Sequence, residues 1–300
     1  MAGVRQRAIS RETTWDSSEK AHPEMDAVAK LRPVEQCEGL ERGMARLVRT
    51  IEGEIIPRLM LAHRSGAGEA VSSPPGPAGL SAQDVQAFSR LVLKKDLAEA
   101  TAFVEARRAR GSSLEALYLD LLAPAARYLG ELWEADLCDF TEVTFGLWRL
   151  QQLVRELSPA FQHEAEYRGH DRRALLLPVP GEQHSFGLFM VAEFLRRAGW
   201  DVWAGPEVSV EELLSIVRKE PFAVVGLSVS SEQRLEGLAT TIHAIRRASR
   251  NRGVGVMVGG QIFKERPELV ALVGADATAL DGRQACLQAE SLLRLLPRVG

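Results

Sequence analysis

Three short segments in the second half of the chain carry the residues best suited to chemistry. In GEQHSFG, Glu182 stands two residues before His184, and the later segments are SVS at 228–230 and a glycine pair at 259–260. A carboxylate beside an imidazole can accept a hydrogen bond from one ring nitrogen, which leaves the other nitrogen free to bind a metal. Serine hydroxyls bind polar groups, and paired glycines let a bulky ligand approach the backbone. Together these residues could hold a ligand that contains a metal.

The pattern of apolar residues from Arg172 onward predicts the elements that position these segments. Short apolar runs alternate with amphipathic helices, and we expect strands at 174–179, 200–205, 222–229, 254–260 and 277–282. Such alternation implies a parallel sheet, because parallel strands need crossover connections. The predicted fold class is therefore α/β, with a five-stranded, doubly wound, flavodoxin-like sheet of order 2-1-3-4-5.

The strand order predicts where a ligand binds. Ligands of doubly wound sheets lie beyond the carboxyl ends of the strands, at the point where the strand order reverses. For this order that point lies between the first and third strands. The segments with Glu182 and His184, with Ser228 and Ser230, and with the glycine pair follow the first, third and fourth strands. We therefore expect them to line one site, together with Asp281–Gly282 after the fifth strand.

Residues 82–168 are expected to form a four-helix bundle ahead of the sheet domain. Apolar residues recur three and four positions apart in four consecutive segments with short connections. Ser112 and Asp139 each stand three residues before a glutamate, which is the spacing of a capping box. They mark the expected starts of the third and fourth helices, and Trp133 lies near the end of the third.

The first 80 residues are expected to form a separate N-terminal region. Residues 1–35 are polar and predict a mobile tail, and an amphipathic helix is predicted at about 38–64. A linker rich in Pro, Gly and Ser follows at 65–84. An amphipathic helix ahead of a linker is typical of an element that docks onto its own protein or onto a partner. The predicted domains are thus 1–80, 82–168 and 172–300.

The composition is that of an ordinary globular protein, and it excludes several classes. The 300 residues are 46% hydrophobic and 26% charged, and a net charge of -3 offers no basic excess for binding nucleic acid. Cys37, Cys138 and Cys286 are too scattered for a disulfide framework or a CxxC zinc site. No apolar run is long enough to span a bilayer, and the N-terminus has no apolar signal core. We therefore expect a soluble cytoplasmic protein without membrane contact, whose action on DNA is indirect or weak.

The residues at the predicted switch point favour a planar ligand with a metal centre. A phosphoryl-accepting receiver domain needs an aspartate after the third strand, where this chain has serines, and no GxGxxG motif marks a dinucleotide site. A flavin mononucleotide site would use Ser, Thr and Asn after the first strand, where this chain has Glu182 and His184. A buried imidazole that faces glycine and serine loops suits a metal-centred planar ligand. The alternatives are a haem or flavin sensor on the same sheet and an interaction module that has lost its ligand.

A resemblance to a known family rests on these same segments. EQHSFG, SVS and GG, in this order behind a helical bundle, resemble the cobalamin-binding domain family over about residues 82–300. The resemblance implies that His184 is the lower axial ligand of cobalt, and that Glu182, where the family has aspartate, binds its other ring nitrogen. It also implies that the remaining loop residues admit the corrin and its nucleotide tail. These are Gly187, Ser228, Ser230, Gly259 and Gly260.

Longer segments resemble one group within that family, the PpaA/AerR-type photosynthesis regulators of purple bacteria. They are GEQHSFGLFMVAEFLRRAGW, LWEADLCDFTEVTFGLWRLQ and GADATALDGRQA. This likeness implies an antirepressor without catalytic turnover that responds to light or redox state through hydroxo- or adenosylcobalamin. Its partner would be a DNA-binding repressor of photosystem genes, of the CrtJ/PpsR type. The alternative is a corrinoid carrier for a methyltransferase.

The likeness also implies that the bundle covers the upper face of the corrin. Trp133 occupies the position of the family's cap tryptophan. Ten residues on, some light-sensing and methyl-transferring relatives have a Glu-His pair, where this chain has Val143 and Thr144. The upper ligand of cobalt is therefore left to water or to a histidine from elsewhere, and His63 is a speculative candidate.

Overall fold

The computed structural model describes residues 80–94, 96–163, 172–182 and 184–295. The predicted amphipathic helix at about 38–64, His63 and Cys37 lie outside these ranges. Among the helices that are described, none combines the length and the apolar character needed to cross a membrane.

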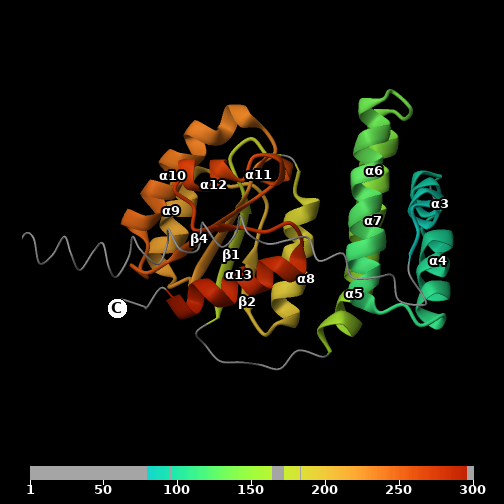
Figure 1. Ribbon diagram of the computed structural model, residues 1–300, viewed down its shortest axis with the longest axis horizontal. Helices are drawn as coiled ribbons and strands as arrows, with labels where there is room; N and C mark the ends of the chain where they lie inside the picture. The colour runs from blue at the N-terminus through green and yellow to red at the C-terminus, as the bar shows by residue number, and fades with distance from the viewer. Residues whose placement is uncertain (1–79, 95, 164–171, 183, 296–300) are drawn as a thin grey trace, which may run out of the picture. The chain divides into compact units, whose positions relative to one another are not determined.

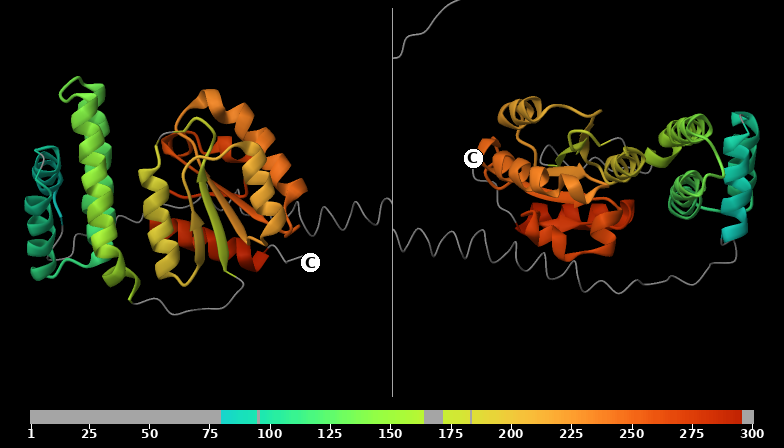
Figure 2. Two further views of the ribbon diagram at one scale, coloured as in Figure 1. Left: turned by 180° about the vertical axis from the view of Figure 1, so that it is seen from behind. Right: turned by 90° about the horizontal axis from the view of Figure 1, so that it is seen from above.

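A five-stranded parallel sheet with helices on both faces forms the C-terminal part of the chain (Figures 1 and 2). Its strands are β1 (Arg173–Pro178), β2 (Asp201–Ala204), β3 (Val224–Ser228), β4 (Gly255–Gly259) and β5 (Ala277–Thr278). The order is β2-β1-β3-β4-β5, which confirms the prediction, and every neighbouring pair is parallel. The central strands β1 and β3 are almost wholly buried because both of their faces are covered, whereas the edge strand β2 is largely exposed.

The pairing register sets the carboxyl ends of the central strands side by side. Pro178 of β1 pairs with Ser228 of β3, and Ser228 in turn pairs with Gly259 of β4. The loops that leave these three strands contain the predicted site residues. The sheet therefore gathers those residues at its switch point, as the strand order requires.

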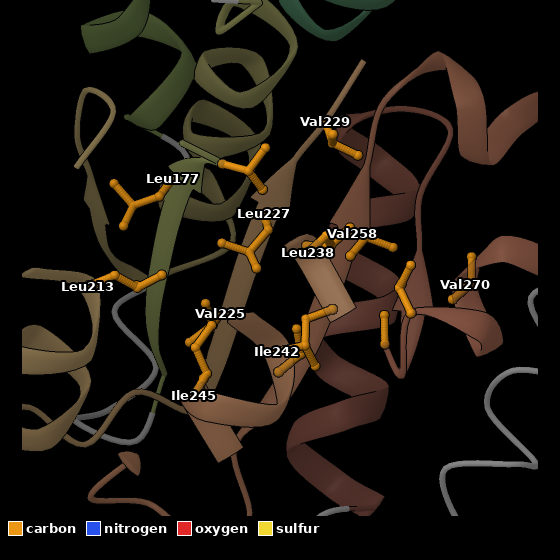
Figure 3. Close-up of a cluster of buried hydrophobic side chains, with 14 of the residues drawn as sticks. Leu177, Leu213, Val225, Leu227, Val229, Leu238, Ile242, Ile245, Val258 and Val270 are labelled. Carbon is orange, nitrogen blue, oxygen red and sulfur yellow. The ribbon is translucent and has the colours of Figure 1, made fainter. Parts of the chain in front are cut away.

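Two hydrophobic cores cover the two faces of the sheet. The helices around it are α8 (Phe186–Arg197), α9 (Val210–Lys219), α10 (Leu235–Ala248), α11 (Gln261–Glu265), α12 (Glu268–Leu272) and α13 (Gly282–Leu295). On one face, Leu177 and Leu227 belong to a core shared with Leu238 and Ile242 of α10 (Figure 3). On the other face, Leu176 belongs to a core shared with α8 and α13. Successive residues of a strand alternate between the two cores, as the pleat dictates.

Within the described residues, four helical segments precede the sheet. They are α3 (Ala82–Leu93), α4 (Leu97–Ala109), a continuous run of α5 (Leu114–Ala116), the π-helical segment η2 (Leu117–Leu122) and α6 (Ala123–Glu134), and finally α7 (Phe140–Gln162). The capping box of Asp139 and Glu142 forms at the start of α7, as predicted. The bundle has its own apolar core, which includes Phe88, Leu121 and Leu150.

The third helix begins one residue later than the sequence predicts. Its N-cap is Ser113, whose hydroxyl accepts a hydrogen bond from the Ala116 N–H, so the predicted capping box of Ser112 and Glu115 is wrong. The Glu115 carboxylate forms an ion pair with Arg197 of α8 instead. Glu115 thus pairs with distant residues and not with the cap of its own helix.

Helix α7 of the bundle packs against α8 of the sheet domain. Tyr118 stacks on Phe161 with ring centroids 4.2 Å apart, and Phe161 meets Phe194 of α8 edge-on at 5.0 Å. Beside these rings, the buried carboxylate of Glu193 accepts a hydrogen bond from the Ser158 hydroxyl at 2.5 Å. Apolar and polar contacts therefore both join α8 to the bundle.

Candidate functional site

A buried carboxylate, that of Glu182, is the centre of the loop after β1. Its side chain is 1% exposed. One oxygen, Oε1, accepts a hydrogen bond from the His184 backbone N–H at 2.8 Å and lies 2.7 Å from the ring Nδ1 of the same residue. The other oxygen, Oε2, accepts hydrogen bonds from the backbone N–H and the hydroxyl of Ser230, both at 2.6 Å. A single carboxylate therefore joins the loops after β1 and β3.

These contacts keep Glu182 ionised. Burial alone would raise the pKa of this carboxyl, but the hydrogen bonds from Ser230 and His184 outweigh it and lower the pKa to about 2. An ionised carboxylate can only accept hydrogen bonds, so we assign the imidazole proton to Nδ1. This tautomer leaves the lone pair of His184 Nε2 available to a metal ion.

The His184 side chain is 74% exposed, so the prediction of a buried imidazole is wrong. The residue stands just before α8, which begins at Phe186, and the loop places its ring at the rim of the sheet domain. The buried member of the pair is Glu182, whose carboxylate contacts the ring Nδ1. An exposed ring with a fixed tautomer is well suited to meet a large ligand.

The two predicted serines lie in different environments. Ser228, the last residue of β3, is buried, and its hydroxyl oxygen has no hydrogen-bond partner among the described residues. An unsatisfied buried hydroxyl is costly, so a polar ligand group that reached it would be stabilised. The Ser230 hydroxyl is bound to Glu182 instead. The role of both serines along the nucleotide tail stays a prediction.

The predicted glycines also differ in what they contribute. A Cβ atom added at Gly187 or Gly259 would meet no atom within 4 Å, so both positions border open space. Gly260 has a φ of +133°, and a Cβ there would lie 1.8 Å from the carbonyl oxygen of Val229. Glycine is therefore required at 260 by the backbone itself, whereas at 187 and 259 it leaves room for a ligand.

An exposed aromatic face lies on the bundle. Trp133, at the end of α6, is 47% exposed, which excludes a role in filling the bundle core. Phe140 and Trp148 of α7 are also exposed, and their spacing of eight residues places them on one side of the helix. That side continues to Ser158, which contacts α8. Only Trp133 was expected from the sequence, although the aromatic residues of α7 were a usable signal.

Two charged residues that the sequence analysis did not name contact the same loop. Arg234, which follows β3, donates a hydrogen bond to the carbonyl oxygen of Gly181, and the carboxylate of Glu207, which follows β2, accepts one from the Gly181 N–H. Neither residue belongs to a recognisable motif. The one sequence signal for them was that both stand in segments that follow predicted strands, where the site is expected.

Comparison with known proteins identifies the domain that carries these residues. Residues 172–289 match the family model described as the B12 binding domain. The match covers the whole sheet and the site residues in the loops after β1, β3 and β4. Over 174 residues, 58% of this chain and 90% of the relative, the sequence is 29% identical to the "Uncharacterized 20.5 kDa protein in bchF-crtJ intergenic region" of Rhodobacter capsulatus.

The sheet domain and the helices before it also resemble a solved structure. The monomethylamine corrinoid protein of Methanosarcina barkeri is similar with a TM-score of 0.60 and 16% identity, over 70% of this chain and 98% of that chain. This similarity establishes a shared fold. It agrees with the predicted order of a helical region followed by a five-stranded parallel sheet.

A corrinoid is the cofactor class that a B12-binding domain implies, and the residues present fit such a group. His184 offers a ring nitrogen at the rim of the domain, the unpartnered hydroxyl of Ser228 lies buried at the switch point, and Gly187 and Gly259 border open space. A nitrogen ligand of this kind suits cobalt. The chain's donor set and the space around it are thus consistent with the family match.

Proposed function

We propose that this cobalamin-binding protein is a transcriptional regulator that binds its corrinoid through His184 and acts on a repressor protein. The observation that carries the proposal is the pair of Glu182 and His184 at the switch point of a B12-binding domain. When bound, the corrinoid would supply a cobalt centre that responds to light or redox state.

The chain's own residues divide the work of binding. His184 would bind the cobalt through Nε2, and Glu182 holds the Nδ1 proton, which orients the ring and increases its basicity. The hydroxyl of Ser228 binds a polar group of the nucleotide tail. Gly259 would leave room for that tail, and Trp133 would pack against the corrin.

The regulatory role is supported by the relative from Rhodobacter capsulatus, which is encoded between bchF and crtJ. This position favours a repressor of the CrtJ type as the partner. The residues at the bundle support a role without turnover: Thr144 stands at the position of the upper-face histidine, and its hydroxyl donates to the Phe140 carbonyl oxygen at 2.7 Å. The protein would bind one conformation of the repressor more tightly than the other. By linkage, the bound repressor would then have a lower affinity for DNA.

The test of cofactor binding is retention of corrinoid after desalting. Wild-type protein incubated with hydroxocobalamin is expected to keep the corrinoid absorption spectrum. His184→Ala should lose most of it, while the control His243→Ala, at an exposed position on α10, should behave as the wild type. Failure of the wild-type protein to retain any corrinoid would contradict the proposal.

The regulatory step is tested on the repressor. Protein loaded with adenosylcobalamin is kept in the dark or illuminated, mixed with a CrtJ-type repressor, and assayed for its effect on repressor–DNA affinity. We expect the two states to differ in that effect. Equal effects of both states, together with methylation of the bound cofactor by a methyltransferase, would indicate the carrier role instead.

A further inference from the structure

The side chain of Arg234 spans two groups of the loop that carries His184. Arg234 ends the short 3-10 helix η3 (Glu232–Arg234), which follows β3. One guanidinium nitrogen donates to the carbonyl oxygen of Gly181 at 2.5 Å, and another lies 3.6 Å from Oε2 of Glu182. The planar guanidinium has several N–H donors in a fixed fork, so it can contact both groups at once. Arg234 thus contacts the backbone and the carboxylate on which the His184 ring depends.

A second charged side chain holds the same peptide from the other side. Glu207, from the loop after β2, accepts a hydrogen bond from the Gly181 N–H. Gly181 has a φ of +80°, in the left-handed region that glycine adopts readily. Its N–H and its carbonyl are therefore both bound by charged side chains from neighbouring loops. The turn that leads into Glu182 and His184 is fixed by long-range contacts.

An exposed ligand benefits from such a fixed loop. The His184 ring is 74% exposed, so little packing restrains it apart from its contacts with Glu182 and Ser230. If the loop were mobile, binding of the metal would have to order it, and the entropy cost of that ordering would lower the affinity. Residues that orient a metal ligand through its partner commonly change metal affinity by about 10–100-fold.

We propose that Arg234 is a positioning residue for cobalt coordination, and that together with Glu207 it clamps the Gly181–Glu182 segment so that His184 is prearranged as the axial ligand. This inference rests on the proposed binding of a corrinoid through His184. The arginine acts through the loop and touches neither the imidazole nor the metal. Its removal should therefore weaken coordination without unfolding the domain.

The test compares Arg234→Gln with Arg250→Gln. Arg250 is a matched control, because its side chain also donates to a backbone carbonyl, that of Lys219 at 3.0 Å, but it stands before β4 at the amino edge of the sheet. Hydroxocobalamin affinity is measured by equilibrium dialysis, and folding by thermal denaturation without corrinoid. We expect R234Q to bind about tenfold more weakly than the wild type and R250Q to stay within about twofold.

A spectroscopic readout separates positioning from general destabilisation. In protein labelled with ¹⁵N-histidine and reduced to cob(II)alamin, electron paramagnetic resonance reports the fraction of cobalt bound by a histidine nitrogen through a doublet splitting, whereas the cofactor's own base gives a triplet. At saturating corrinoid, R234Q should show a smaller fraction than the wild type. Glu207→Ala, which releases the same peptide from the other side, should do the same.

Three results distinguish the possible failures. Unchanged or tighter binding by R234Q, with an unchanged fraction of histidine-coordinated cobalt, would overturn the clamp. Tighter binding is the result expected if Arg234 only withdrew charge from Glu182 and so weakened the His184 ligand. An effect of R250Q equal to that of R234Q would overturn it as well. Absence of binding by the wild type would refute the proposed function itself, and the clamp with it.

Discussion

Glu182 is the residue that makes an exposed histidine an ordered ligand. It is buried, it stays ionised, and its two oxygens bind the loop of His184 and the loop of Ser230 at once. The charge is stabilised by these hydrogen bonds, so the carboxylate contributes to folding before any ligand binds. One residue thus links the stability of the switch point to the geometry of the site.

This link predicts how stability without corrinoid depends on pH. The folded pKa of Glu182 is about 2, below its usual value of 4.5, so its contribution is complete above about pH 4.5 and is lost as the pH falls towards 2. Glu182→Gln should lower the free energy of unfolding by about 3 kcal/mol at pH 7, and this difference should shrink by about half at pH 3.

The measurement is urea unfolding of both proteins at the two pH values. Glu236→Gln, at an exposed position on α10, serves as the control and should show little difference at either pH. If E182Q lowers the free energy of unfolding by the same amount at pH 7 and pH 3, the ionised carboxylate is not what stabilises the loop.

At the scale of elements, β4 ends in two glycines that do different things. Gly259 completes the strand and borders open space, whereas Gly260 turns the chain with a positive φ against the Val229 carbonyl. The first position concerns the ligand and the second concerns the fold. A shared sequence motif therefore contains two separable requirements.

Two alanine variants test this separation. Gly260→Ala should lower the free energy of unfolding by about 3 kcal/mol, because the new Cβ meets a backbone carbonyl and the backbone is strained. Gly259→Ala should change stability by less than about 1 kcal/mol and should weaken hydroxocobalamin binding, since its Cβ fills the open space. Chemical denaturation measures the free energy of unfolding of each variant, and a titration measures its affinity for hydroxocobalamin. Equal loss of stability in the two variants would contradict the assignment.

The elements of the sheet domain were predictable because each one has a strong local signal. Alternating apolar runs and amphipathic helices allow one topology class, and the strand order then locates the switch point. The pair of Glu182 and His184 was predictable from its spacing of two residues. The π-helical segment η2 and the late start at Ser113 were not, because they depend on packing and on an ion pair with a distant helix.

The parts of the site that escaped prediction are those set by tertiary contacts. Nothing in the sequence says that the Ser230 hydroxyl binds Glu182, that the imidazole is exposed, or that Arg234 and Glu207 hold Gly181 from two sides. Each contact joins loops that follow different strands. Their pairing is fixed only when the sheet brings the strand ends together.

At the scale of the whole molecule, α8 connects the site to the bundle. It begins at Phe186, two residues after His184, and its far side contacts α7 through Phe194 and Glu193. A change in how the histidine loop is held would be passed to a helix that already packs on the bundle. This path gives the proposed regulator a physical route from cobalt ligation to the surface of its helical region.

The measurement that tests cobalt ligation by His184 most directly is electron paramagnetic resonance of protein grown with ¹⁵N-histidine. The protein is loaded with hydroxocobalamin and reduced to cob(II)alamin. A histidine axial ligand predicts that the nitrogen splitting changes from a triplet in unlabelled protein to a doublet in labelled protein, and that His184→Ala removes the doublet. A triplet that persists in the labelled protein would show that the cofactor's own base, and not His184, binds the cobalt.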